Sequence, residues 1–533
     1  MNLKAGQLEK YCFLLITFIS LYPVFTGIVF PTLDGPAHLH NANLINALLF
    51  NEQSIIHDFV EINPEPVPNW LGHFLLSFFN LFLPAFIAEK LLFICYIIGL
   101  PYSFRSLVNR THPENRLVSY LIFPFIFSSF FFLGFYNFNL SLILLFFTLS
   151  FWLKIYQNNH ASTGAVIQLS LLITLTYFSH VFVFVILMAI IGLYLLIGVI
   201  HRYAHTRENG SGLRSFFLKQ IKFLTLASVI PLLLFANYFF SREASTFNHY
   251  LSASDLTKNL TDMSIMKGLM SEEQPLINVL FYTFLMLFIY AIYQRIRSMI
   301  RSYKNTTHRR ILSLLTPGDT WIVIALVLLA AYYVSPDVND FGGVISLRIA
   351  LLFYLSVLVW IIGQRLNKWI QLTVAGIFII VHFLRIDFYV EKTEGLREYG
   401  QKCYELSSVI QPNSVVLPLN YINNWLFLHF SNYIGADKPV IVLENYECTK
   451  DYFPLRWKMQ TIPSPSIDGK SLQSIGCNHW PYTANQAVKI DYIFVMGNFP
   501  EEPDACTSEL MRLVQENYHL VSDKGDVKLY QLN

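Results

Sequence analysis

Residues 11–50 read YCFLLITFISLYPVFTGIVF followed by PTLDGPAHLHNANLINALLF, and the boundary between these two halves decides how the chain is placed. The first half is apolar over the length that a helix needs to cross a bilayer, and it lacks the small-residue cleavage site of a signal peptide. Lys4 and Lys10 precede it, whereas residues 31–70 contain five acids and no Lys or Arg. The positive-inside rule therefore predicts a cytoplasmic N-terminus and places Asp34 outside.

The overall composition is that of a polytopic membrane protein. Hydrophobic residues make up 54% of the chain and charged residues 14%, against about 25% charged residues in soluble domains. The 37 Lys and Arg nearly balance the 35 Asp and Glu. The chain therefore lacks the excess of positive charge that is typical of nucleic-acid-binding proteins, and no nucleic acid is expected as a partner.

Apolar runs predict about eleven transmembrane helices in all. Region 71–104 is long for one crossing and short for two, and we count one net crossing with a re-entrant or tilted piece. Two crossings there would put the basic loop 201–222 outside, against the positive-inside rule. The runs after the first are 71–104, 117–136, 139–157, 163–179, 181–200, 223–240, 275–294, 319–335, 347–363 and 369–385.

Composition changes after residue 385, which predicts two domains. Residues 1–385 form a transmembrane domain with a first external loop at 31–70, and residues 386–533 form an extracytoplasmic α/β domain. Strand-like runs at 414–419, 439–443 and 491–496, a helix-like stretch near 505–516 and a closing hairpin support the α/β prediction.

Four cysteines lie in the predicted α/β domain, and their state is open at this stage. Cys403, Cys448, Cys477 and Cys506 form two disulfides in any of three pairings if the compartment is oxidising. Free thiols are the alternative.

The segment after the first span predicts a short helix in the membrane interface. Pro36 suits a first helical turn, and Leu44, Ile45, Leu48 and Leu49 share one stripe.

Asp34 then lies at the start of this helix, where the macrodipole stabilises a carboxylate. His38 lies one turn further on, on about the same side. Two roles are open for Asp34: a helix cap, or a catalytic base.

Further polar residues are predicted at the same outer face. Arg348 stands at the end of a span, where a charge is costly unless it is paired or functional; snorkelling, or pairing with Asp337 or Asp340, is the alternative. The same choice between substrate binding and a structural role applies to the other candidates: Arg242, His180, His38, His73, Tyr136 and Asn137.

The layout resembles the C-type (GT-C) superfamily of membrane glycosyltransferases, including protein mannosyltransferases and aminoarabinose transferases. The residues that carry the resemblance are TLDGPAHL at 32–39, PVPNWLGHFLL at 66–76 and YFSH at 177–180. Family members typically carry Asp-Glu, Glu or Asp-x-Asp in the first loop. Here Gly35 follows Asp34 and no acid is adjacent, so a divalent metal requirement has no support from this motif.

The resemblance implies transfer of a sugar from a polyprenyl-phosphate donor to an unknown acceptor, a protein, lipid or polysaccharide. Asp34 would be the general base of an inverting reaction, and Arg348 the first choice for the phosphate, followed by Arg242. Motifs for nucleotide, zinc or redox cofactors are absent from the sequence, and no cofactor is expected.

Two other functions remain open, a lipid or glycan transporter or flippase and a non-catalytic membrane scaffold. The spans contain few ionisable residues apart from Glu89 and Lys90, and no repeat is visible, which counts against a coupled transporter. A bacterial cytoplasmic membrane is the expected location.

Overall fold

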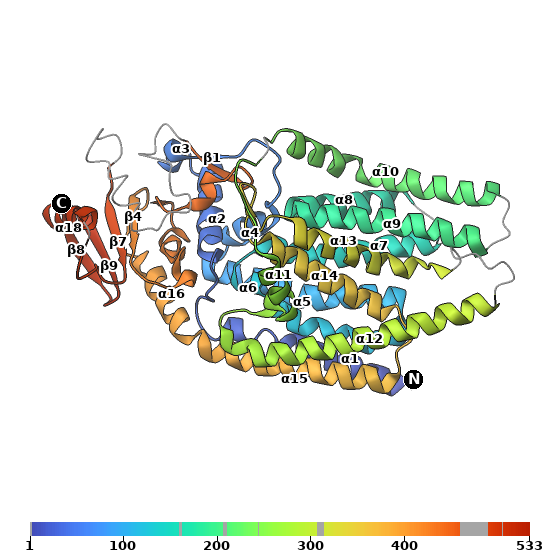
Figure 1. The fold of residues 1–533 in the computed structure, drawn as a ribbon. Coiled ribbons are helices and arrows are strands. Elements are labelled where there is room, and N and C mark those ends of the chain that lie inside the picture. The colour runs from blue at the N-terminus through green and yellow to red at the C-terminus, as the bar shows by residue number, and fades with distance from the viewer. Residues whose placement is uncertain are drawn as a thin grey trace. The chain divides into compact units, whose positions relative to one another are not determined.

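The computed structural model describes residues 3–158, 162–205, 210–242, 245–305, 314–458, 489–503 and 505–533. The chain forms two compact units (Figure 1). Unit 1 comprises Met1–Ser20, Tyr96–Phe131 and Phe138–Phe388, and unit 2 comprises Leu21–Cys95, Phe132–Asn137 and Tyr389–Asn533. Sequence-distant segments therefore fold together in each unit.

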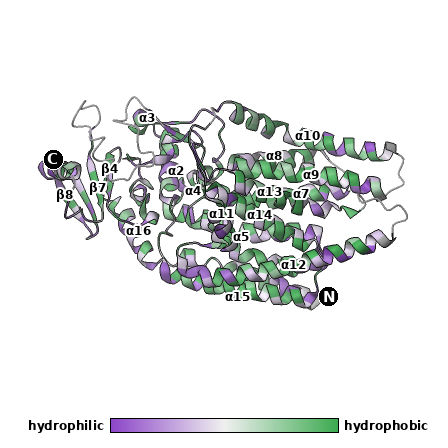
Figure 2. Ribbon diagram, in the orientation of Figure 1, coloured by the Kyte–Doolittle hydropathy of each residue, from purple (hydrophilic) through white to green (hydrophobic). Residues whose placement is uncertain are grey.

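Long apolar helices make up most of unit 1, and Figure 2 shows them as predominantly hydrophobic along their length. Within the unit, α8, α9 and α10 pack together, as do α13 and α14. Among the described residues, the helices that lie wholly or partly in unit 1 are α1 (Leu3–Ile19), α5 (Ala85–Thr111), η2 (Pro113–Phe127), α6 (Ser129–Phe132), α7 (Tyr136–Asn158), α8 (Thr163–Ser179), α9 (Val181–His205), α10 (Gly210–Phe240), α11 (Ala253–Thr261), η3 (Ser264–Met266), η4 (Ser271–Glu273), α12 (Gln274–Asn305), η6 (Pro317–Asp319), α13 (Thr320–Val334), α14 (Ile345–Ile362) and α15 (Lys368–Lys392).

The predicted membrane class is confirmed. Ten helical segments of the described chain are long and apolar enough to span a bilayer, and the eleventh predicted span corresponds to α8, a shorter apolar helix. Region 71–104 contains the ten-residue helix α4 (Leu71–Asn80) and then the start of α5. Because ten residues rise only about 15 Å, α4 is too short to cross, and this region supplies one span.

Unit 2 contains a five-stranded sheet with the order β5-β4-β7-β9-β8. Strand β4 is parallel to β5 and β7, whereas β9 is antiparallel to β7 and β8. The predicted strands, closing hairpin and helix of the α/β region are confirmed. Their bounds are β4 (Val415–Asn420), β5 (Ile441–Val442), β7 (Tyr492–Met496), α18 (Ala505–Asn517), β8 (Tyr518–Asp523) and β9 (Val527–Leu532).

Residues 31–70, predicted as the first external loop, are part of the same unit as this sheet. Helix α2 (Gly35–Phe50) sends Leu44, Ile45 and Ala47 into the core that the strands share. Strand β1 (Val60–Ile62) pairs antiparallel with β6 (Leu455–Trp457). Residues 60–62 are thereby paired with a strand that follows them by almost 400 residues in the sequence.

Helix α2, which the sequence predicts to lie in the membrane interface, is enclosed by other parts of unit 2. Almost all of its first thirteen residues are buried inside unit 2, where it packs against α4 and the 3₁₀ helix η8 (Phe430–Gly435). Asn41 and Asn43, which lie outside the predicted apolar stripe, are buried as well, and Asn41 hydrogen-bonds within the unit. The apolar stripe indicated one buried face, but partners cover the polar face too.

Cys403 and Cys448 are buried free thiols, so neither is part of a disulfide. Cys477 and the side chain of Cys506 lie outside the described residues. The remaining elements of unit 2 are η1 (Tyr22–Phe25), α3 (Ile56–Phe59), α16 (Glu394–Leu406), η7 (Trp425–Phe427) and η9 (Tyr446–Thr449).

Candidate functional site

Asp34 occupies the N-cap position of α2, as predicted, but its carboxylate does not cap the helix. The side chain makes no capping hydrogen bond, although the backbone carbonyl of Asp34 accepts from the amide of His38 (3.0 Å). Pro36 lies in the first turn, where its missing N–H costs nothing. The buried carboxylate is therefore left for contacts with other segments of unit 2.

Two glycines make the close packing around Asp34 possible. A Cβ on Gly35 would lie 2.1 Å from Oγ1 of Thr32 and 2.3 Å from the hydroxyl of Tyr136. Gly134 has a φ of +74°, and a Cβ there would lie 2.8 Å from the Asp34 amide nitrogen. Glycine is thus required sterically at position 35 by its neighbours.

The carboxylate of Asp34 faces a histidine from the C-terminal part of the chain. Nε2 of His429 lies 3.8 Å from Oδ1 of Asp34, and Nδ1 of His429 lies 2.5 Å from Oε1 of Glu444. Since a carboxylate can only accept, Nδ1–H donates to Glu444. Ser431 and Asn432 also donate to Glu444. This carboxylate orients the imidazole toward Asp34.

The residues around Asp34 change the pKa of its carboxyl group. Burial raises the pKa of Asp34 to about 6, although the charges of His429 and His38 and a hydrogen bond from Tyr446 oppose the rise. The Tyr446 ring stacks on His429 with centroids 4.3 Å apart. A carboxylate with this pKa is ionised at neutral pH and is a better proton acceptor than an exposed aspartate.

A second cluster joins His38, His73 of α4 and Glu447 of η9. Nδ1 of His38 lies 2.7 Å from Oε1 of Glu447, and Nε2 of His73 lies 2.8 Å from Oε2. The two facing histidine nitrogens are 3.2 Å apart. Burial alone would raise the pKa of Glu447, but the two histidines hold it far below its usual range.

Tyr136 and Asn137, predicted near substrate, make internal contacts in unit 2. The Tyr136 hydroxyl donates to Oε1 of Glu89 (2.5 Å) and lies 2.9 Å from Oγ1 of Thr32. Oδ1 of Asn137 accepts from the amide of Gly72 (2.6 Å) at the start of α4. These contacts fix the positions of both side chains within unit 2.

The other predicted residues, His180, Arg242 and Arg348, belong to unit 1. His180 follows the last residue of α8 and packs edge-on against Phe138. The guanidinium of Arg348, in the first turn of α14, is close enough to interact electrostatically with His180. Arg242 lies over the rings of Tyr238 and Phe341. Among these three residues, the structure thus places His180 and Arg348 close together.

Asp337 and Asp340, the proposed alternative partners of Arg348, have other contacts in unit 1. Asp337 accepts from the Ser346 amide (3.1 Å), and Asp340 accepts from the Thr246 amide (2.7 Å).

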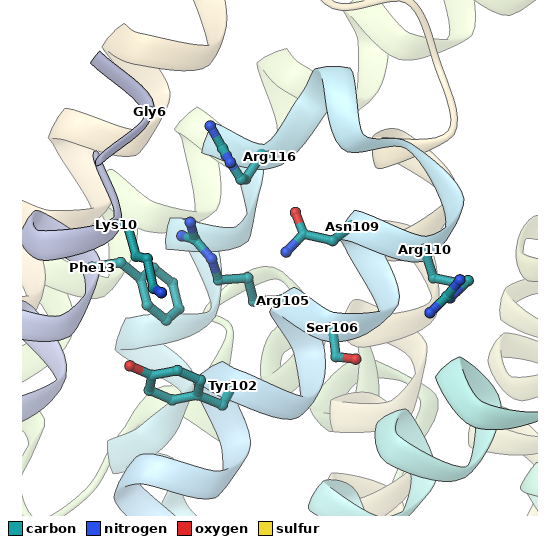
Figure 3. A pocket seen from close by; sticks show the side chains of 9 residues that line it. All are labelled: Gly6, Lys10, Phe13, Tyr102, Arg105, Ser106, Asn109, Arg110 and Arg116. Carbon is teal, nitrogen blue, oxygen red and sulfur yellow. The ribbon is translucent and has the colours of Figure 1, made fainter. Parts of the chain in front are cut away.

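Unit 1 also contains a basic cavity of about 510 Å³, shown in Figure 3. Its cationic lining residues are Lys10, Arg105, Arg110 and Arg116. Glu9 neutralises part of this charge, since it accepts a bidentate contact from Arg105 (both 2.7 Å) and lies 3.0 Å from Nε of Arg116. None of the predicted site residues lines this cavity, and the charge rule predicts that Lys10 faces the cytoplasm.

Four residues of the site were not predicted from the sequence: His429, Glu444, Tyr446 and Glu447. The last three fall in LENYEC, directly after a strand-like run. Two acids so close to a buried strand were the available signal, because carboxylates are rarely buried without a partner. Their partners could not be identified, since these come from the first external loop and from residue 429.

The fold can now be compared with solved structures. Two crystal structures of ArnT from Cupriavidus metallidurans, apo and bound to undecaprenyl phosphate, match with TM-scores of 0.52 and 0.51. In both, 10% of residues are identical and the match covers 99% of this chain and 98% of ArnT. The chain has the GT-C fold.

A second GT-C protein is similar over part of its length. The oligosaccharyltransferase AglB from Archaeoglobus fulgidus, in complex with an inhibitory peptide and a dolichol-phosphate, matches at a TM-score of 0.47 and 10% identity. The match covers 98% of this chain and 74% of AglB. Neither a protein-family model nor a curated protein sequence matches the chain.

Proposed function

We propose that the protein is an integral membrane glycosyltransferase that transfers a sugar from a polyprenyl-phosphate donor to an acceptor at the extracytoplasmic face. Asp34 accepts the proton of the acceptor hydroxyl as that oxygen attacks the anomeric carbon. The bond to the phosphate breaks on the opposite side, and the configuration inverts. The lipid phosphate leaves with the bonding electron pair.

The observation that carries this proposal is the state of the Asp34 carboxylate. It is buried, it does not cap its helix, and its pKa lies at about 6. A helix cap would hydrogen-bond to the amides of the first turn, and its pKa would be lowered by that contact. A buried acid with a raised pKa beside an oriented histidine is typical of a general base.

The donor class rests on the GT-C fold and on the ligand of a structural neighbour. ArnT of Cupriavidus metallidurans has been solved with undecaprenyl phosphate, which supports a lipid-phosphate leaving group here. Arg348 and the adjacent His180 are the residues that we assign to this phosphate, because a guanidinium binds two phosphate oxygens at once. The acceptor, the sugar and a bacterial inner-membrane location are part of the proposal.

The test compares surface glycans and polyprenyl-phosphate sugars by mass spectrometry in cells with wild type, a deletion, Asp34→Asn, or Glu52→Gln. Glu52 is an exposed acid of the same loop and is the matched control. We expect Asp34→Asn to reproduce the deletion, with one glycan residue lost and its lipid-linked donor accumulated. The control should match wild type.

A transporter or flippase predicts a different result. Purified protein in liposomes would then move lipid or glycan at a rate that Asp34→Asn leaves unchanged. That outcome, together with unchanged glycans in the Asp34→Asn cells, would reject the transferase.

A further inference from the structure

Three ligand-type side chains from three distant parts of the chain converge in the core of unit 2. His38 comes from α2, His73 from α4 and Glu447 from η9, and all three are buried. One donor atom from each lies within 4.8 Å of the others. The lone pairs of these three buried side chains face one another and repel. The cluster is therefore stable only with protons or a metal ion between its members.

Backbone carbonyls fix which histidine nitrogens face the centre. Nε2 of His38 lies 3.0 Å from the carbonyl oxygen of Gly134, and Nδ1 of His73 lies 3.0 Å from that of Asn69. A carbonyl only accepts, so each of these nitrogens carries a proton. In the neutral rings, Nδ1 of His38 and Nε2 of His73 therefore present their lone pairs to each other and to Glu447. Histidines that bind metals are held by this same kind of contact.

The spacing of the two nitrogens fits one small tetrahedral ion. Two nitrogens about 2.0–2.1 Å from zinc are about 3.3 Å apart at a tetrahedral angle, and the observed separation is 3.2 Å. The carboxylate oxygens, at 2.7 and 2.8 Å from these nitrogens, would withdraw by about half an ångström on metal binding.

Glu447 is also hydrogen-bonded by a residue that is not part of the cluster. Asn41 donates to Oε2 of Glu447 (2.5 Å), and the Asn445 side chain donates to Asn41 (2.5 Å). Oε1 is buried and accepts no aligned hydrogen bond from any described residue. Both oxygens of Glu447 therefore face the two histidines, and the hydrogen bond from Asn41 holds Oε2 in place.

We propose that His38, His73 and Glu447 form a binding site for a single zinc ion. Two imidazoles and one carboxylate suit zinc rather than magnesium or calcium, which prefer oxygen ligands. The ion would join α2, α4 and η9 and place a positive charge one helical turn from Asp34. The assignment concerns metal binding and does not depend on the transfer reaction.

The test measures metal on the purified full-length protein in detergent. The protein is stripped with a chelator, reloaded with zinc chloride alone, desalted and analysed by inductively coupled plasma mass spectrometry. We expect about one zinc per chain in the wild type and a loss of that zinc in His73→Gln and Glu447→Gln. His57→Gln is the matched control, because His57 is a partly exposed histidine of the same loop and should leave the stoichiometry unchanged.

A second readout covers the case in which a variant fails to fold. Wild-type protein reloaded with cobalt(II) should show the intense visible absorption of a tetrahedral site, and zinc should raise its unfolding temperature. Wild type that loses its zinc on desalting, or His73→Gln that keeps it, would overturn the proposal. Neither readout requires turnover, so failure here leaves the test of Asp34 unaffected.

Discussion

Nε2 of His429 lies 3.8 Å from Oδ1 of Asp34, although the two residues come from opposite ends of the chain. The contact is possible because the first external loop folds into the same unit as the C-terminal sheet. Glu444 holds the far side of the imidazole. The arrangement gives the proposed base an oriented, titratable neighbour.

The first prediction concerns the pH dependence of transfer. Because Asp34 acts when deprotonated and its pKa is about 6, the rate should rise as the pH increases through about 6 and level off above it. An assay of sugar transfer from a polyprenyl-phosphate donor between pH 5 and 8 measures this limb. A rate that stays constant down to pH 5 would contradict the role of Asp34.

Asp34→Asn should lower the rate by about 10²–10⁴-fold at neutral pH without unfolding the protein. The pKa of Asp34 in the folded protein is raised above its ordinary value of 3.8. Ionisation therefore costs stability as the pH rises through the window from 3.8 to about 6. An uncharged side chain avoids that cost, so thermal unfolding at pH 7 should find the variant at least as stable as wild type. A large loss of stability would indicate a structural role instead.

His429→Gln tests the positioning of Asp34. The His429 charge lowers the pKa of Asp34, so its removal should move the acid limb to higher pH and lower the rate several-fold near pH 6. His519→Gln, a change at an exposed histidine of the same unit, should leave the profile in place. A uniform loss of rate with no shift of the limb would mean that His429 only supports the fold.

Gly35→Ala should destabilise the protein. The new methyl group would meet three buried side chains at once, those of Thr32, Tyr136 and Glu89, and overpacking typically costs about 1–3 kcal/mol. Gly395→Ala in α16 is the control, because a Cβ there meets no atom within 4 Å. Denaturation in the same detergent compares the two. Equal stability of both variants would show that the packing around Gly35 relaxes readily.

Arg348→Ala should weaken use of the lipid-phosphate donor. Loss of a charge-assisted contact of about 1.5–3 kcal/mol corresponds to a decrease in kcat/KM of about 10- to 100-fold. Arg348→Lys should recover only part of this loss, since an ammonium group cannot make a bidentate contact. Arg297→Ala, at an exposed position of α12, is the control. Wild-type kinetics in Arg348→Ala would remove the phosphate assignment.

Much of the candidate site was predictable from local signals. Asp34, His38 and His73 stand out as polar residues next to apolar spans, and Pro36 marks the helix start. What α2 contacts was not predictable. Its stripe of leucines indicated one buried face, yet Asn41 on another face is buried against Glu447.

The sequence offers no support for a metal site because Asp34 in the first loop has no adjacent acid. Two of the three ligands in the proposed zinc site were already candidates, but the third, Glu447, is separated from them by most of the chain. No spacing rule links such residues, because their proximity arises from the pairing of β1 with β6 and the packing of α2 on the sheet.

The sequence by itself determined the membrane class, the approximate spans and the α/β character of the C-terminal region. These depend on the length of apolar runs, the position of basic loops and the alternation of side chains, all of which are local properties. Only the tertiary structure decided which polar groups surround Asp34. Burial and the approach of charges from distant segments set its pKa, and both exist only after the chain has folded.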